Sequence, residues 1–144
     1  MGNLRRFLII FMAMLMIGLS YSCSIGKDSQ ALKAEIDKYP EVSFNDLNKL
    51  VNEGTVFLID ANERETYNDG HILGAVNFLA ESSEFDQDLP QEKDKLVVCY
   101  CGSEKCLAWL DAAKELNSLG YTNVMHYKGG IKGWKKSGGE IEKG

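Results

Sequence analysis

The sequence has fewer basic than acidic residues, few histidines and no apolar run as long as a typical membrane span. Its 144 residues include 16 lysines and arginines against 21 aspartates and glutamates, and only two histidines. The basic residues form no stripe, which argues against nucleic acid as a partner. Internal repeats and low-complexity tracts are also absent. The length and composition are those of one globular domain with a core of ordinary size.

The N-terminus carries the most apolar part of the chain, residues 7–19, directly after Arg5 and Arg6. This run is short for a membrane span and typical of a secretory signal, so we expect a signal peptide over residues 1–22 and export to the cell envelope or periplasm. Residues 19–23 resemble a bacterial lipoprotein cleavage box. That resemblance implies that Cys23 is lipidated and anchors the mature chain to a membrane. A soluble exported protein and an uncleaved anchor are the alternatives.

The cysteine count argues against a purely structural disulfide framework. The chain has four, and three remain after Cys23: Cys99, Cys101 and Cys106. An odd number in an exported protein leaves at least one thiol free or only transiently paired.

Apolar periodicity predicts an α/β domain. Residues 23–38 read as a tether or peripheral helix, and residues 39–144 as the domain. Buried strands are expected over 56–59, 75–78, 96–100 and 123–127, and helices over 43–54, 63–68, 107–119 and around Trp134. Alternating strands and helices imply a parallel sheet. Ligands bind beyond the carboxyl ends of such strands, where Asp60, Cys101 and the Gly129-Gly130 turn all fall.

Cys101 lies on a short loop between a buried strand and a helix. Free N–H groups and the helix dipole stabilise a thiolate at that position, and the thiolate is the nucleophilic form of cysteine. A small apolar core residue is the alternative interpretation.

Three stretches resemble the rhodanese-like domain family. They are 58–63 with 70–77, then 97–101, then 120–124 with 127–134, and together they cover about residues 40–136. The resemblance implies a three-layer rhodanese-like fold with a central, mostly parallel sheet flanked by helices. It also implies a sulfurtransferase that carries sulfane sulfur as a persulfide on Cys101. A small sulfur donor and a thiol or protein acceptor would be its partners, and it would need no cofactor or metal.

The same resemblance makes residues 101–106 an active-site loop whose N–H groups surround the sulfur. Its expected substrate-binding residues are Gly102, Ser103, Glu104, Lys105 and Cys106. Asn62, Gly102 and Cys106 stand where the family often has basic or threonine side chains. An anionic donor such as thiosulfate would therefore be attracted less strongly.

Other polar residues favour supporting roles. We expect Asp60 to order neighbouring loops by hydrogen bonding, and His71 to be a hydrogen-bonded structural residue. Cys99 reads as a core residue. The lysines near the C-terminus read as a solvated helix face: Lys132, Lys135 and Lys136.

Two further functions stay open. Cys106 is either a resolving thiol, which would make a redox pair with Cys101, or a small residue at a helix start. The missing basic side chains also fit a binding module without activity. A soft-metal site on the three cysteines lacks a histidine at suitable spacing, so we assign no metal.

Overall fold

The computed structural model describes residues 28–79, 85 and 87–144. The predicted signal peptide, residues 1–22, and the lipidation site Cys23 lie outside these ranges. The chain divides into two compact units, Met1–Lys38 and Tyr39–Gly144. In the first unit, residues 28–36 are helical. None of the helices in the described ranges has the length and apolar character needed to cross a bilayer.

A four-stranded parallel sheet forms the centre of the second unit. Its strands are β1 (Phe57–Asp60), β3 (Ala75–Asn77), β4 (Val97–Tyr100) and β5 (Val124–Tyr127), in the order β3-β1-β4-β5. Asp60 is in register with Asn77 on one side and Tyr100 on the other, and Tyr100 is in register with Tyr127. All four strands therefore end level at one edge.

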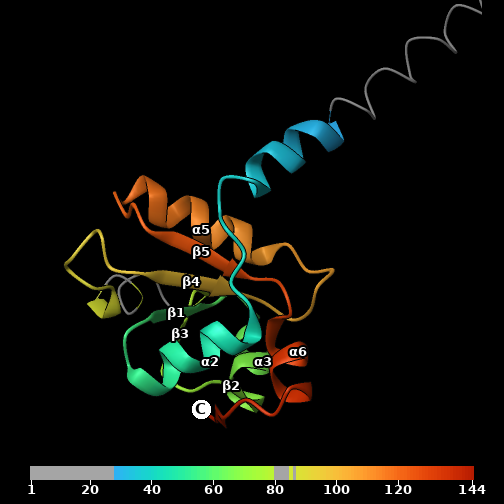
Figure 1. Cartoon of the computed structure of the whole chain (residues 1–144), viewed down its shortest axis with the longest axis vertical. Helices are drawn as coiled ribbons and strands as arrows, with labels where there is room; N and C mark the ends of the chain where they lie inside the picture. Colours follow the sequence, from blue (N-terminus) through green and yellow to red (C-terminus); the bar gives the residue numbers. More distant parts are fainter. Residues whose placement is uncertain (1–27, 80–84, 86) are drawn as a thin grey trace, which may run out of the picture. The chain divides into compact units, whose positions relative to one another are not determined.

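Helices cover both faces of this sheet. The helix α5 (Ala108–Ser118) lies on one face, while α2 (Phe44–Glu53) and α6 (Gly130–Lys136) lie on the other (Figure 1). The expected three-layer α/β fold is thus confirmed. The start of α2 follows from its sequence, because the Ser43 side chain accepts a hydrogen bond from the Asp46 N–H. Gly54 ends α2 in the left-handed conformation.

The core is divided by the sheet. Leu58, Val98 and Tyr100 pack with Leu47 of α2 and Trp134 of α6 in one buried cluster. Strand alternation sends the side chain of each intervening residue, including Cys99, to the α5 face. The α5 residues buried there are Trp109, Leu110, Ala112, Ala113 and Leu116.

A second, two-stranded antiparallel sheet joins β2 (His71–Ile72) to β6 (Ile141–Glu142). The short helix α3 (Arg64–Asp69) precedes β2. The sequence analysis predicted α3 but neither strand of this sheet. Two-residue strands are too short to produce a periodic hydrophobic signal.

Candidate active site

The candidate site is the loop that joins β4 to α5. Cys101 follows the last residue of β4, and its side chain is only 1% exposed. The loop is tightened by a hydrogen bond of 2.9 Å from the Cys106 N–H to the Ser103 carbonyl. The N-terminus of α5 begins two residues after Cys106. The structure therefore places Cys101 between a buried strand and a helix N-terminus, as the sequence predicted.

The first turn of α6 supports the loop from outside. The Ile131 N–H donates to the Cys101 carbonyl at 2.8 Å, and the Lys132 N–H donates to the Gly102 carbonyl at 3.2 Å. Gly130 has φ +60°, and a Cβ atom there would lie 2.5 Å from the Cys101 carbonyl oxygen. Only glycine combines this conformation with so close an approach. The Gly129-Gly130 turn thus lies against the cysteine loop, at the sheet edge where the sequence placed both.

Two thiols share the inside of the loop. The side chains of Cys101 and Cys106 interact with each other, and each affects the pKa of the other. Backbone N–H groups of Trp109 and Gly102 interact with the Cys101 thiol, and those of Ala108 and Gly102 interact with the Cys106 thiol. Cys101 is buried and Cys106 is half-buried, and neither is in a disulfide. The N-terminus of α5 therefore provides donors to both sulfurs.

The two thiols differ in acidity. Burial, together with the neighbouring Cys106 thiol, raises the pKa of Cys101 to about 12. Burial also acts to raise the pKa of Cys106, but the Cys101 thiol and the Ala108 and Gly102 N–H groups outweigh it and lower that pKa. Cys106 is therefore the more acidic thiol of the pair.

Asp60 orders the neighbouring loop by hydrogen bonding. Its Oδ1 accepts from the backbone N–H of Asn62 at 2.7 Å and from the Asn62 side-chain amide at 2.6 Å. The Asn77 amide donates to the Asn62 carbonyl at 2.8 Å. Asn62 in turn borders the cysteine loop, since a Cβ atom on Gly102 would lie 3.2 Å from the Asn62 Oδ1. These contacts link the ends of β1 and β3 to the loop after β4.

The second carboxylate oxygen of Asp60 is less well satisfied. Among the described residues, Oδ2 has no hydrogen-bond partner of normal geometry, although the Tyr100 hydroxyl interacts with the carboxyl group. Burial raises the pKa of Asp60, and the bonds from Asn62 and Tyr100 only partly oppose this. Asp60 is thus a buried carboxyl group at the sheet edge that carries the cysteine loop, and it is hydrogen-bonded to the backbone and side chain of Asn62.

His71 lies in the small sheet. Its Nδ1 is 2.9 Å from the Tyr67 carbonyl, and its Nε2 is 3.2 Å from a carboxylate oxygen of Glu142. The ring stacks on Tyr67 with the centroids 3.7 Å apart. These contacts match a structural histidine that fastens β2 to α3 and β6. The structure gives it no contact with the cysteine loop.

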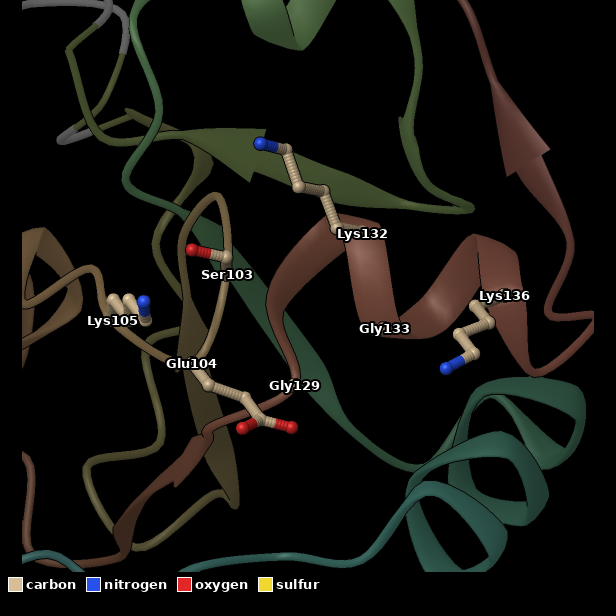
Figure 2. Close-up of a pocket in the computed structure, with 7 residues that line it drawn as sticks. All are labelled: Ser103, Glu104, Lys105, Gly129, Lys132, Gly133 and Lys136. Atoms are coloured by element: carbon tan, nitrogen blue, oxygen red, sulfur yellow. The ribbon is translucent and has the colours of Figure 1, made fainter.

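A pocket of about 290 Å³ opens between the cysteine loop and α6 (Figure 2). Its lining residues are Ser103, Glu104, Lys105, Gly129, Lys132, Gly133 and Lys136. Sequence analysis gave Lys132 and Lys136 no role, but their spacing of four residues places them on one helix face. This spacing, so close to the Gly129-Gly130 turn, was the sequence signal that could have identified the two lysines as site residues.

The cysteines do not gather into a metal centre. Across residues 28–79, 85 and 87–144, no three His, Cys, Asp or Glu side chains come together as metal ligands. Cys99 is completely buried, and burial raises its pKa well above the usual range. The polar atoms that converge on Cys101 are N–H groups and the Cys106 thiol. Such a set stabilises an anion on sulfur.

The family model of the rhodanese-like domain matches residues 43–137 of this chain. A thiosulfate sulfurtransferase of Shewanella oneidensis, GlpE, is 26% identical over 103 residues, covering 71% of this chain and 98% of that protein. The rhodanese-like domain of Alr3790 from Anabaena is 29% identical with a TM-score of 0.59, covering 72% and 79%. The human single-domain sulfurtransferase TSTD1 is 26% identical with a TM-score of 0.55, covering 67% and 96%. This chain therefore belongs to the rhodanese-like domain family.

Proposed function

We propose that this protein is a sulfurtransferase that carries sulfane sulfur as a persulfide on Cys101. The observation that carries the proposal is the position of Cys101 directly after β4, where the backbone N–H groups of Gly102 in the loop and Trp109 in α5 interact with its thiol. A terminal persulfide sulfur is anionic and needs such donors in a site shielded from water. Two relatives named as sulfurtransferases align with 71% and 67% of this chain, and the second, a solved structure, has a similar fold.

The transfer takes place in two balanced steps. Cys106, whose pKa is lowered, ionises first and takes the proton of Cys101. The Cys101 sulfur then attacks the terminal sulfur of the donor, so that a new S–S bond forms and the S–S bond of the donor breaks. The remainder leaves as sulfite from thiosulfate, or as a thiol from a low-molecular-weight persulfide. An acceptor thiolate then attacks the outer sulfur and releases Cys101 as a thiolate.

The test is the intact mass of the full reduced chain after treatment with thiosulfate and, separately, with a low-molecular-weight persulfide. The proposal predicts a gain of one sulfur atom that disappears in Cys101→Ser. Full sulfur loading of Cys101→Ser would refute it. No gain with either donor would favour a rhodanese-like binding module without activity.

A second candidate function is supported by the interaction between the Cys101 and Cys106 thiols, which lie in one short loop. The two thiols could close a disulfide, passing two electrons and two protons to an oxidant such as a low-molecular-weight disulfide. This thiol redox module predicts a loss of two hydrogens from the intact mass, reversed by mild reductant. A pair that stays reduced under such an oxidant would exclude it.

We also propose that the chain is exported and held at a membrane by a lipid on Cys23. The support is the sequence alone: Arg5 and Arg6, then the apolar run 7–19, then the cysteine. Mass analysis of the N-terminal peptide from a bacterial expression host tests it. Lipidated Cys23 as the first residue is the expected result, and an unmodified cysteine in an intact leader would contradict it.

A further inference from the structure

The pocket beside the cysteine loop contains charges of both signs. Lys132 and Lys136 come from α6, whereas Glu104 and Lys105 come from the loop itself. All four side chains are exposed. In Figure 2 the carboxylate of Glu104 and the ammonium group of Lys136 both turn toward the space between the loop and α6. The Lys132 ammonium group turns the opposite way in the same view, so Lys136 is the lysine of α6 that stands across the pocket from Glu104.

These charges are not neutralised by each other. Among the described residues, the ion pairs within 4.0 Å involve other side chains, and none joins Glu104 to a lysine across the pocket. The Tyr127 hydroxyl lies beside the same wall, since a Cβ atom on Gly133 would be 3.4 Å from it. The pocket therefore offers separate cationic and anionic partners to one bound molecule.

The pocket shares its wall with the sulfur site. Ser103 and Glu104 lie two and three residues after Cys101, and Lys132 donates its N–H to the Gly102 carbonyl. A molecule bound in the pocket is thus held beside the loop that contains the nucleophile. Fixing the non-reacting part of a donor in this way orients its reacting sulfur.

We propose that this pocket binds the amino-acid head of a low-molecular-weight persulfide, with its carboxylate at Lys136 and its ammonium group at Glu104. This deepens the proposed function and rests on it. Cysteine persulfide is the simplest such donor. The Cys101 thiolate takes its outer sulfur, the donor S–S bond breaks, and cysteine leaves as the thiol. Thiosulfate has two negative charges and no cation, so it leaves Glu104 unpaired.

Three donors separate the two contacts. Cysteine persulfide carries both head groups, N-acetylcysteine persulfide lacks the ammonium group, and cysteamine persulfide lacks the carboxylate. The measured quantity is the rate of persulfide loading on Cys101 of the full chain, as a function of donor concentration. Wild type should load from cysteine persulfide at about two- to fivefold lower concentration than from either truncated donor, which is the size expected of exposed charge pairs.

Each charge variant should erase one of these differences. Glu104→Gln should make cysteine persulfide and its N-acetyl derivative equivalent, and Lys136→Ala should make cysteine persulfide and cysteamine persulfide equivalent. Lys135→Ala is the matched control, because Lys135 lies on the same helix but its Nζ is beside Gly70.

The outcomes separate the two levels of the proposal. Equal half-saturating concentrations for the three donors, or variants that weaken all three alike, would overturn the amino-acid pocket and leave sulfur transfer standing. No loading of wild type from any donor would overturn both the pocket and the proposed function.

Discussion

The Cys106 thiol interacts with the Cys101 thiol, and backbone N–H groups of the loop and of the first turn of α5 interact with both. Cys101 is buried and Cys106 is half-buried. Cys106 is therefore the more accessible cysteine, although Cys101 is the one that directly follows β4. Small reagents meet Cys106 first, while Cys101 is protected by the loop and by the helix start.

Alkylation should follow this difference. Since the pKa of Cys106 is lowered and that of Cys101 is raised to about 12, iodoacetamide should label Cys106 at lower pH than Cys101. Cys101→Ala removes the thiol that lowers the pKa of Cys106, so that pKa should rise. Peptide mass spectrometry across a pH series measures both effects. Cys99→Ala is the control and should leave the Cys106 profile unchanged, and labelling of Cys101 before Cys106 would contradict the assignment.

The loop should depend on the absence of a side chain at residue 130. Gly130→Ala forces a left-handed conformation on alanine, which costs about 1–2 kcal/mol, and overpacks the Cys101–Ser103 backbone for about 1–3 kcal/mol more. Gly138 has φ +82° with open space around its Cβ position, so Gly138→Ala carries only the conformational cost. Chemical denaturation compares the two. Equal destabilisation would show that α6 does not press on the loop.

Asp60 should act through its hydrogen bonds to Asn62. Asp60→Ala leaves two buried donors of Asn62 without an acceptor and should lower the free energy of unfolding by about 1–3 kcal/mol. Asp60→Asn keeps an acceptor oxygen and should lose much less. Equal losses in the two variants, measured by chemical denaturation, would refute the hydrogen-bonding role.

The pH dependence of Asp60 has a defined sign. Its pKa is raised in the folded chain, so its contribution to stability is full below the unfolded value of 3.8 and is lost as the pH rises through the folded pKa. In Asp60→Asn this part of the pH dependence should vanish. An unchanged acid limb in the variant would contradict the raised pKa.

His126 should weaken the fold in mild acid. Its ring stacks on Trp109 with the centroids 4.0 Å apart, and its Nδ1 lies 2.9 Å from the Tyr39 carbonyl. Burial lowers its pKa from 6.5, so the unfolded chain takes up the proton first. Its contribution to stability is present above 6.5 and is lost as the pH falls from there through the folded pKa.

The measurement for His126 is the free energy of unfolding between neutral pH and about pH 5. His126→Phe keeps an aromatic ring beside Trp109 without a titrating group, so its curve should be flatter than that of wild type. Parallel curves for the two proteins would assign the acid sensitivity to other groups.

Much of this architecture could be predicted from local sequence signals. Ser43 and Gly54 mark the ends of α2, and the apolar run before Cys101 marks the central strand. Their signals are local, because capping and burial are properties of neighbouring residues. The placement of Cys101 followed from the order of strand, loop and helix.

The remaining parts depend on contacts between distant segments. Asn77 supports Asn62 because β3 pairs with β1, which no periodic pattern specifies. Lys132, Lys136 and Glu104 line one pocket only because α6 packs on the cysteine loop. The acidity of Cys106 likewise depends on how the loop turns its side chain toward Cys101. Residue types alone do not encode these distances.

The most direct measurement is the location of the added sulfur after the full reduced chain reacts with cysteine persulfide. Alkylation, digestion and mass spectrometry of wild type, Cys99→Ser, Cys101→Ser and Cys106→Ser identify the cysteine that carries it. The account predicts a persulfide on Cys101 in wild type, in Cys99→Ser and in Cys106→Ser, and none in Cys101→Ser. A persulfide that persists in Cys101→Ser, or that never forms on Cys101 in wild type, would contradict the assignment of Cys101 as the sulfur carrier.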